Sequence, residues 1–210
     1  MMRISLLTGM LVSGVMLTAG CASKPSITEF QCRAGDWQTV GVRDGAGGMP
    51  STQLLQHQEA CGAFGIVPDR QTYLAGWQQG VAQYCTTDNG FMIGQRGGRQ
   101  SSVCSDDEFL DAYAAGRELY LARQDVRRLE NQLSYNENRI VDIKQEIIGA
   151  STAQLAPDLT ARERIALVAK VEALVEERAE LKRSLPVLLD ELESSRQHLT
   201  RLQQTVAYAG

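Results

Sequence analysis

The chain has 210 residues, with 21 Lys and Arg against 25 Asp and Glu, so its net charge is −4. A mildly acidic chain lacks the broad basic surface that binds nucleic acid, and we expect no nucleic-acid partner. The composition changes near residue 106, where Gly and Cys give way to Leu, Glu, Arg and Ala. This shift predicts two architectures in one chain.

The first twenty residues have the layout of an export signal. Arg3 is followed by an apolar run too short to span a bilayer, and then by small residues at 18–20. With Cys21 directly after them, the stretch resembles the lipobox of bacterial lipoproteins. The resemblance implies a signal peptide over residues 1–20, acyl chains on Cys21 and a lipidated tether over residues 21–31. The alternative is an ordinary secreted protein whose Cys21 is free or dimerises.

The residue after the cysteine bears on the location of the protein. Many enteric lipoproteins that stay at the inner membrane have Asp there, whereas this chain has Ala22. The resemblance therefore implies a protein of the cell envelope, held by its lipid in the outer membrane and facing the periplasm. The inner membrane is the alternative.

The four other cysteines fall in a Gly-rich and Cys-rich module over residues 32–105. They are Cys32, Cys61, Cys85 and Cys104. An even number of cysteines in an oxidising compartment predicts two disulfides, and three connectivities are open. We favour Cys32–Cys61 with Cys85–Cys104, because each pair closes a local loop. Each bridge contributes about 2–4 kcal/mol of stability.

A metal site is the competing use of these side chains. His57 stands four residues before Cys61, which would place the two on one helix face. The chain contains only two His and no Cys-x-x-Cys pair, so the ligand spacing of a zinc site is absent from the sequence. We expect no metal and no cofactor.

Two segments of the module repeat. Tyr73–Tyr84 matches Phe109–Tyr120 at an offset of 36, with aromatic residues, Gly and Tyr at helical spacing. Each follows an acidic cap candidate, Asp69 in one case and residues 105–108 in the other. We predict two similar helices that pack on each other near Gly80 and Gly116. The alternative is a chance recurrence of one amphipathic pattern.

Glycine-rich stretches lie between these segments. Residues 88–90 form a turn signal within the 85–104 segment, and this predicts a disulfide-closed loop or hairpin. The stretch 36–48 is similarly turn-rich. The 85–104 segment lacks the Lys-Ser/Thr of a phosphate-binding loop, and Asp44-Gly45 lacks the further acidic residues of an EF-hand.

The spacing of Cys and Gly over residues 32–120 is similar to that of a family of small bacterial lipoproteins known only as a domain of unknown function. The resemblance implies an envelope location and supplies no activity. The matching elements are Cys32, Asp36-Trp37, Gly41, Asp44-Gly45, His57, Cys61, Asp69, Tyr73, Gly76, Gly80, Tyr84-Cys85, Gly90, Gly94, Gly97 and Cys104.

Residues 106–210 are predicted to be helical. Apolar residues recur three and four apart from Ala112 to Ile147 and again from Leu167 to Val206, as in coiled-coil helices. The segment 149–159 interrupts the pattern, with Gly149 as a helix cap. The apolar phase continues through Pro186 and favours one kinked helix over two.

The predicted fold is therefore mainly α, with a small disulfide-stapled helical and loop module followed by a long antiparallel coiled-coil hairpin. The alternative is that one arm pairs with another subunit.

Architecture favours a structural or protein-interaction role over catalysis. His57 is the candidate general base, with Asp44 and Asp69 in the same module, but no complete catalytic motif is present, and we expect no enzyme. A second hypothesis is glycan binding through the rings of Trp37 and Trp77. We favour a membrane-anchored protein whose coiled coil binds an envelope protein or a second copy of itself.

Overall fold

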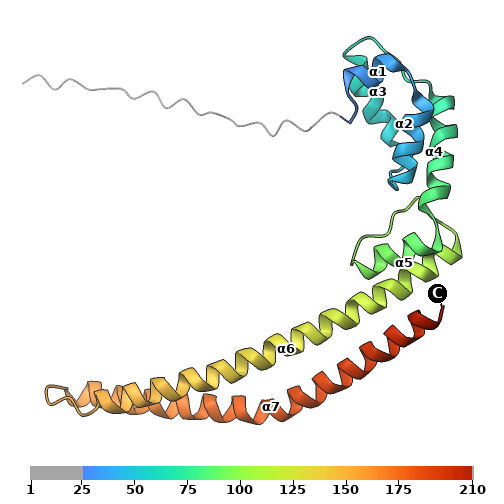
Figure 1. Cartoon of the computed structure of the whole chain (residues 1–210). Helices are drawn as coiled ribbons and strands as arrows, with labels where there is room; N and C mark the ends of the chain where they lie inside the picture. The colour runs from blue at the N-terminus through green and yellow to red at the C-terminus, as the bar shows by residue number, and fades with distance from the viewer. Residues whose placement is uncertain (1–25, 210) are drawn as a thin grey trace, which may run out of the picture.

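The computed structural model describes the backbone of residues 26–209 and the side chains of residues 26–205. This part of the chain is mainly helical and contains no strand, which confirms the predicted fold class. The short helices form a base, from which the two long helices project as a hairpin (Figure 1). The helices are α1 (Glu29–Ala34), α2 (Trp37–Ala46), α3 (Gln53–Gly62), α4 (Arg70–Tyr84), α5 (Thr87–Gln95), α6 (Asp107–Ala153) and α7 (Ala161–Ala209).

The predicted signal peptide and the predicted lipid anchor at Cys21 lie outside the described residues, so both stay predictions. Ser26, the first residue that the structure describes, lies within the predicted tether. Among the residues described, no helix is long and apolar enough to cross a membrane.

Acidic side chains start α4 and α6, as predicted. Asp69 accepts hydrogen bonds from the backbone N–H groups of Gln71 and Thr72, at 2.9 and 3.1 Å. Asp106 accepts from the N–H of Phe109 at 2.8 Å. These bonds satisfy N–H groups that have no partner within the first turn of a helix. The bonds from Thr72 hold the pKa of Asp69 below its usual value.

Glycines bring α2 and α4 into backbone contact. A Cβ at Gly45 would overlap the carbonyl oxygen of Trp77, and one at Gly80 would overlap that of Val42. Only glycine permits so close an approach of two helix backbones. We call α2 and α4 the first glycine pair. The stretch 36–48, predicted to be turn-rich, is therefore helical over most of its length.

Helix α5 and the first turns of α6 form a second glycine pair. A Cβ at Gly94 on α5 would overlap the carbonyl oxygen of Tyr113 on α6. The prediction of a turn at residues 88–90 within a loop or hairpin was wrong, because these residues lie in α5. The Thr86 side chain accepts from the N–H of Asn89 at 3.3 Å and starts this helix. Burial of its glycine face against α6 offsets the low helix propensity of glycine.

The two repeated helices do not pack on each other. Gly80 lies against α2, whereas Gly116 lies against Phe91 on α5. The predicted crossing of Gly80 with Gly116 was therefore wrong. Each glycine face is matched by a second glycine face on the preceding helix of its own pair.

The two pairs share several details of their backbone. A shift of 49 residues relates α2 to α5, but a shift of 36 relates α4 to α6, because α3 occurs in the first pair alone. Gly48 and Gly97, each two residues after the end of α2 or α5, both have positive φ, at 69° and 75°. In each pair an aromatic side chain then donates to the carbonyl of the next residue. Trp77 Nε1 donates to Met49 O (2.8 Å), and Tyr113 OH donates to Gly98 O (3.0 Å).

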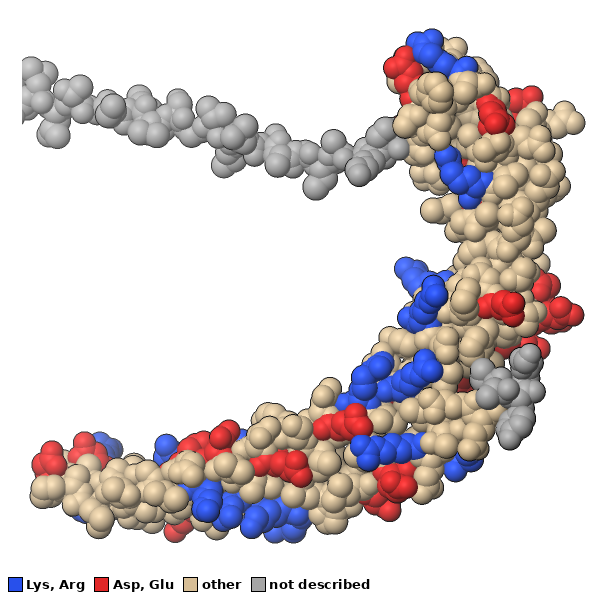
Figure 2. Space-filling view, viewed as in Figure 1, with Lys and Arg blue, Asp and Glu red and all other residues tan. Residues whose placement is uncertain are grey.

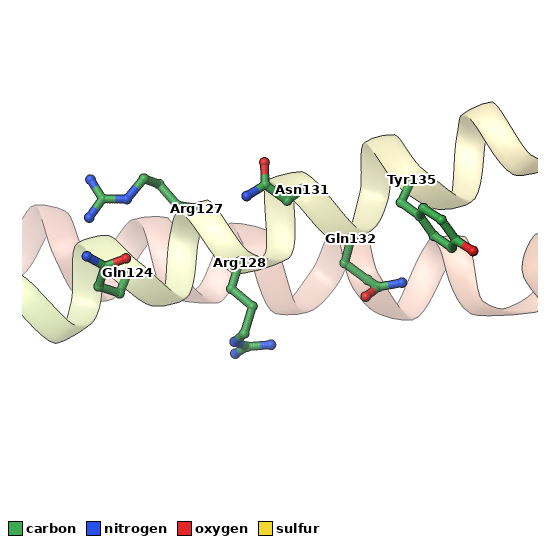
Figure 3. A pocket seen from close by; sticks show the side chains of 6 residues that line it. All are labelled: Gln124, Arg127, Arg128, Asn131, Gln132 and Tyr135. Atoms are coloured by element: carbon green, nitrogen blue, oxygen red, sulfur yellow. The ribbon is translucent and has the colours of Figure 1, made fainter. Parts of the chain in front are cut away.

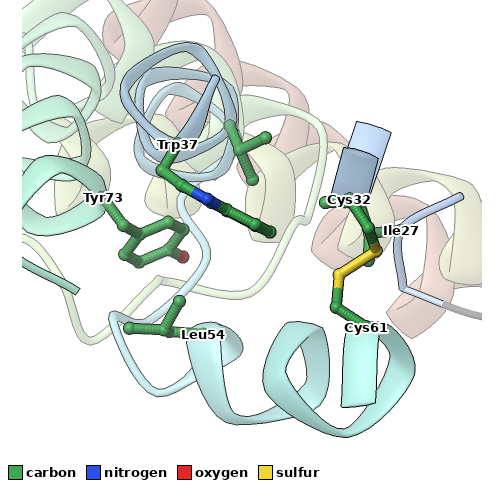
Figure 4. Packing of buried hydrophobic residues seen from close by; sticks show 7 residues of the cluster. Ile27, Cys32, Trp37, Leu54, Cys61 and Tyr73 are labelled. Atoms are coloured by element: carbon green, nitrogen blue, oxygen red, sulfur yellow. A yellow bond between two sulfur atoms is a disulfide. The ribbon is translucent and has the colours of Figure 1, made fainter. Parts of the chain in front are cut away.

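The disulfides connect the cysteines as favoured from the sequence, Cys32 to Cys61 and Cys85 to Cys104. Each bridge joins the segment before the first helix of a glycine pair to the segment before its second helix. Cys32 and Cys61 are buried in a core with Trp37 and Tyr73, where the Trp37 ring lies between Tyr73 and the disulfide (Figure 4).

Helices α6 and α7 pack antiparallel, with 47 and 49 residues, so the hairpin is about 70 Å long. The intramolecular coiled-coil hairpin is thus confirmed. Asn136, the amide of the predicted seam, is buried and donates to Ser184 Oγ at 3.1 Å. Helix α7 continues through Pro186, as the apolar phase predicted, and it bends near its middle (Figure 1).

The turn of the hairpin lies later than predicted. Helix α6 passes through Gly149 and ends at Ala153, so the predicted cap at Gly149 was wrong. Buried Ala150 extends the seam by one further step, and the carbonyls of Ala150 and Thr152 accept the last bonds. Pro157 and Asp158 lie in the turn, within the segment 149–159 that was predicted to interrupt the seam.

Candidate functional site

The first glycine pair holds a chain of buried polar side chains. His57 Nε2 donates to Asp44 Oδ2 at 2.6 Å, and Tyr73 OH donates to the same oxygen at 3.0 Å. We assign the His57 proton to Nε2 because a carboxylate only accepts. His57 Nδ1 lies 2.9 Å from Ser26 Oγ. The network joins the segment before α1 to α2, α3 and α4.

Local structure brings these groups together. Leu54, His57 and Cys61 are spaced by three and four residues, so they share the inner face of α3. The Cys61 disulfide fixes that face against α1. Burial raises the pKa of the Tyr73 hydroxyl, and the negative charge of Asp44 raises it further. Tyr73 therefore stays a neutral donor to the carboxylate.

Serine, histidine and carboxylate stand in the order of a hydrolase triad, but the surroundings differ. Catalysis needs an accessible base and a place for the reacting atom. The His57 side chain is only 1% exposed, and both ring nitrogens already have partners. Asp69, the other acidic candidate, caps α4 at the surface instead. The geometry favours a structural role, in which His57 holds Ser26 in place. The absence of enzymatic activity stays a prediction.

Comparison with known proteins finds a family model that matches the region of the two glycine pairs. Residues 36–118 match the model of a family described as a protein of unknown function (DUF2799). We call this matched segment the DUF2799 domain. The match covers less than half of the chain, from the cap of α2 into α6, and confirms the predicted resemblance to a domain-of-unknown-function family. No curated protein and no solved structure matches the chain.

The two tryptophans of the DUF2799 domain are part of its packing. Trp37 is 5% exposed and lies in the core, so its ring offers no open face to a glycan (Figure 4). Trp77 is half-buried, and its indole N–H is bonded to the Met49 carbonyl. The predicted glycan surface would therefore rest on one partly covered ring.

Metal ligands do not gather in the described part of the chain. No group of three or more His, Cys, Asp or Glu side chains there is placed to hold an ion. Of the pair considered for zinc, Cys61 is bonded to Cys32 and His57 to Asp44.

A shallow depression on α6 is lined by polar side chains of that helix alone. Arg127 and Asn131 point to one side of it, and Arg128 and Gln132 to the other (Figure 3). Small-molecule sites are concave, with groups that converge on the ligand. These side chains diverge, so the depression is an open, hydrophilic stretch of helix.

The turn of the hairpin exposes apolar side chains. Leu155 is 81% exposed and Ile165 is 70% exposed. Ile165 lines a groove at the start of α7 together with Leu159, Ala161, Arg164 and Val168. Contiguous exposed apolar surface marks interaction sites. Our reading of the sequence did not single out this groove, although Leu155 and Leu159 on either side of Pro157 were a signal for it.

Proposed function

We propose that the protein is a lipid-anchored envelope protein that uses its hairpin as a protein-interaction arm. The observation that supports this most directly is the apolar groove at the hairpin turn, about 50 Å along the coiled coil from the end of the DUF2799 domain. A rod of this length with an apolar end is suited to contact a partner away from its own membrane surface.

The base, at the other end of the hairpin, is where the proposed membrane anchor joins the protein. Ile27 is buried in the core, and Ser26 is bound by His57. Cys21 precedes Ser26 by five residues, which span at most about 18 Å when extended. An acylated Cys21 would thus hold the DUF2799 domain close to the membrane, in our proposal the periplasmic face of the outer membrane.

The anchor is tested separately from the arm. Fatty-acid labelling of cells should mark the wild-type protein, and Cys21→Ala should abolish both the label and the membrane association. Labelling that persists in Cys21→Ala would contradict the anchor.

The arm is tested by crosslinking from its end. A photocrosslinking residue at position 155 should capture an envelope protein, and Ile165→Asp in the same chain should reduce the yield, because it places a charge in the groove. The matched control is the same crosslinker at Asn138, which is exposed on the shaft of α6. Equal capture from both positions, or capture unaffected by Ile165→Asp, would exclude the groove as the contact.

A further inference from the structure

A row of exposed apolar side chains follows one edge of the hairpin. Val141 and Ile148 lie on α6, seven residues apart, with exposed fractions of 58% and 50%. Val168 and Val175 lie on α7 with the same spacing and fractions of 43% and 53%. In a coiled coil, residues seven apart occupy the same position around the helix. Each helix therefore carries a straight apolar row in addition to its seam.

Both rows lie on the same edge. Glu130 on α6 and Arg196 on α7 form an ion pair at 2.8 Å, which identifies the positions that meet there. Lys144 follows Glu130 by two heptads, and Val175 precedes Arg196 by three. Val141 and Ile148 stand three before and four after Lys144, so they adjoin it on this edge.

The register places the side chains in layers. Arg139 on α6 forms an ion pair with Glu177 on α7, at 2.7 Å. Counting outward from this pair in opposite directions puts Val141 level with Val175, and Ile148 level with Val168. The hairpin edge thus has two apolar layers, each with one side chain from each helix.

Charged layers alternate with the apolar ones. By the same register Lys144 is level with Glu172. Nearer the base the Asn136–Ser184 bond defines a register that is four residues different, and there it puts Glu137 within one residue of Lys182. All four charged side chains are exposed. Within the described residues none of these four forms an ion pair. Figure 2 shows basic and acidic side chains interspersed along the hairpin.

We propose that this edge binds the same edge of a second copy, with both hairpin turns pointing the same way. A two-fold axis along the hairpin sets α6 of one copy against α7 of the other. Val141 then faces the second copy's Val175, and Ile148 faces its Val168. Lys144 faces Glu172, and Glu137 faces Lys182, so each of these four charges meets its opposite.

The reversed orientation fits less well. If the second copy pointed the other way, α6 would face α6, and a crossing centred between Val141 and Ile148 would keep the apolar layers together. That crossing would set Lys144 within one residue of the second copy's Lys144, so like charges would meet at the centre of the edge. The parallel orientation also suits two chains anchored in one membrane, and in this respect the inference rests on the proposed function.

Mixed crosslinking tests the edge. Full-length Ile148→Cys and Val168→Cys chains, carrying different tags, are produced together and treated in membranes with a short bismaleimide, without reductant. A product carrying both tags is expected. The control uses Tyr135→Cys with Val187→Cys, which are 63% and 58% exposed and lie nearly level on the opposite edge. An equal yield from the control, or no mixed product from the test pair, would overturn the proposal.

Charge exchange tests the orientation. Lys144→Glu should weaken self-association of the purified protein about tenfold, measured by sedimentation, because it sets two like charges together twice in each dimer. Adding Glu172→Lys should restore it, since these positions face each other in the parallel dimer. Rescue by Glu137→Lys instead would indicate the reversed orientation and contradict the proposal.

The two proposals fail in different ways. A protein that sediments as a monomer yet still crosslinks to an envelope protein from position 155 would exclude the dimer and leave the interaction arm intact. A dimer with the expected charge rescue but no capture from position 155 would support the dimer and contradict the arm.

Discussion

The two glycine pairs share one backbone arrangement but differ at their centres. In the first pair, Asp44 accepts a hydrogen bond from Tyr73 and a second from His57. The equivalent positions of the second pair, by the shifts of 49 and 36 residues, are Ile93 and Phe109. Phe109 is as fully buried as Tyr73. The same backbone arrangement, which we call the frame, thus encloses a polar centre in the first pair and an apolar centre in the second.

This difference separates what builds the frame from what is added to it. Glycines in backbone contact and a disulfide occur in both pairs, so they suffice for the crossing of the helices. The polar network occurs where α3 and the N-terminal segment join, and it binds His57 and Ser26 there. We infer that the network serves to attach these extra segments, whereas the glycines hold the pair together.

The largest effect is expected from filling a glycine contact. Gly45→Ala and Gly94→Ala each place a Cβ into the backbone of the opposing helix, which cannot move aside as a side chain can. Each should destabilise the DUF2799 domain by about 3 kcal/mol, at the upper end of overpacking costs. Denaturant unfolding followed by circular dichroism measures this. Gly62→Ala, at a position with open space, is the control and should be near neutral.

If the frame is shared, the two alanine variants should lose similar amounts of stability. A cost at Gly45 without one at Gly94 would show that the second pair is held by other contacts. The equivalence of the two pairs would then be one of shape alone.

Loss of a disulfide should have a comparable cost. Replacing both cysteines of either bridge by Ser should lower the free energy of unfolding by about 2–4 kcal/mol. The Cys32–Cys61 loop spans 29 residues and the Cys85–Cys104 loop 19, so the first should cost about 0.4 kcal/mol more by loop entropy. Amide exchange should show the loss of protection in the pair that the missing bridge encloses. Uniform loss over both pairs would contradict their independence.

The glycines also mark where sequence reasoning succeeded and where it failed. The acidic N-caps of α4 and α6, the cysteine pairing and the coiled-coil seam were predictable, because each depends on residues close in sequence or on a regular period. Helices α2 and α5 were missed, since Gly41, Gly45, Gly90 and Gly94 lower helix propensity and resemble turn signals. Their stability comes from partners that are distant in sequence.

A signal for the second half of the repeat was nonetheless present. Gly41, Gly45 and Gly48 have the same spacing as Gly90, Gly94 and Gly97. The insertion of α3 changes the offset from 36 to 49, so a search at one fixed offset detects only one helix of each pair. The Asp44–His57–Ser26 network is not detectable in this way, because nothing in the spacing of these residues requires them to meet.

Exchanging the central aromatic residues of the two glycine pairs should destabilise both pairs. Tyr73→Phe removes a donor to a buried carboxylate and should destabilise by about 1.5–3 kcal/mol. Phe109→Tyr places a hydroxyl in the equivalent apolar position and should cost about 1–3 kcal/mol, because a buried polar group lacks a partner there. Thermal unfolding of the two variants and of their combination measures both. If Phe109→Tyr were stabilising, the new hydroxyl would have a hydrogen-bond acceptor in the second pair, and the contrast between a polar and an apolar centre would be contradicted.

The pH dependence of stability gives a smaller and more specific contrast. Burial and the charge of Asp44 raise the pKa of Tyr73 above its ordinary value of 10.0. The folded state then binds a proton that the unfolded state loses, so stability is retained below pH 10 and falls as the pH rises further. Tyr73→Phe should make this fall shallower, and Tyr113→Phe in the second pair is the control. An identical slope in the wild type and Tyr73→Phe would contradict the assignment to Tyr73.

The smallest expected effect is that of replacing glycine by alanine in α6, where the change in stability should differ in sign between two positions. Gly116 and Gly149 both lie in α6, but a Cβ at Gly116 would overlap the carbonyl oxygen of Phe91, whereas one at Gly149 meets open space. Gly149→Ala should therefore stabilise the hairpin by about 0.5–1 kcal/mol through helix propensity alone. Gly116→Ala should instead be destabilising, since the same gain is outweighed by the lost approach of α5. Thermal unfolding curves of the two variants measure both effects. A destabilising Gly149→Ala would mean that this exposed side of the hairpin is covered, as it would be by a bound second chain.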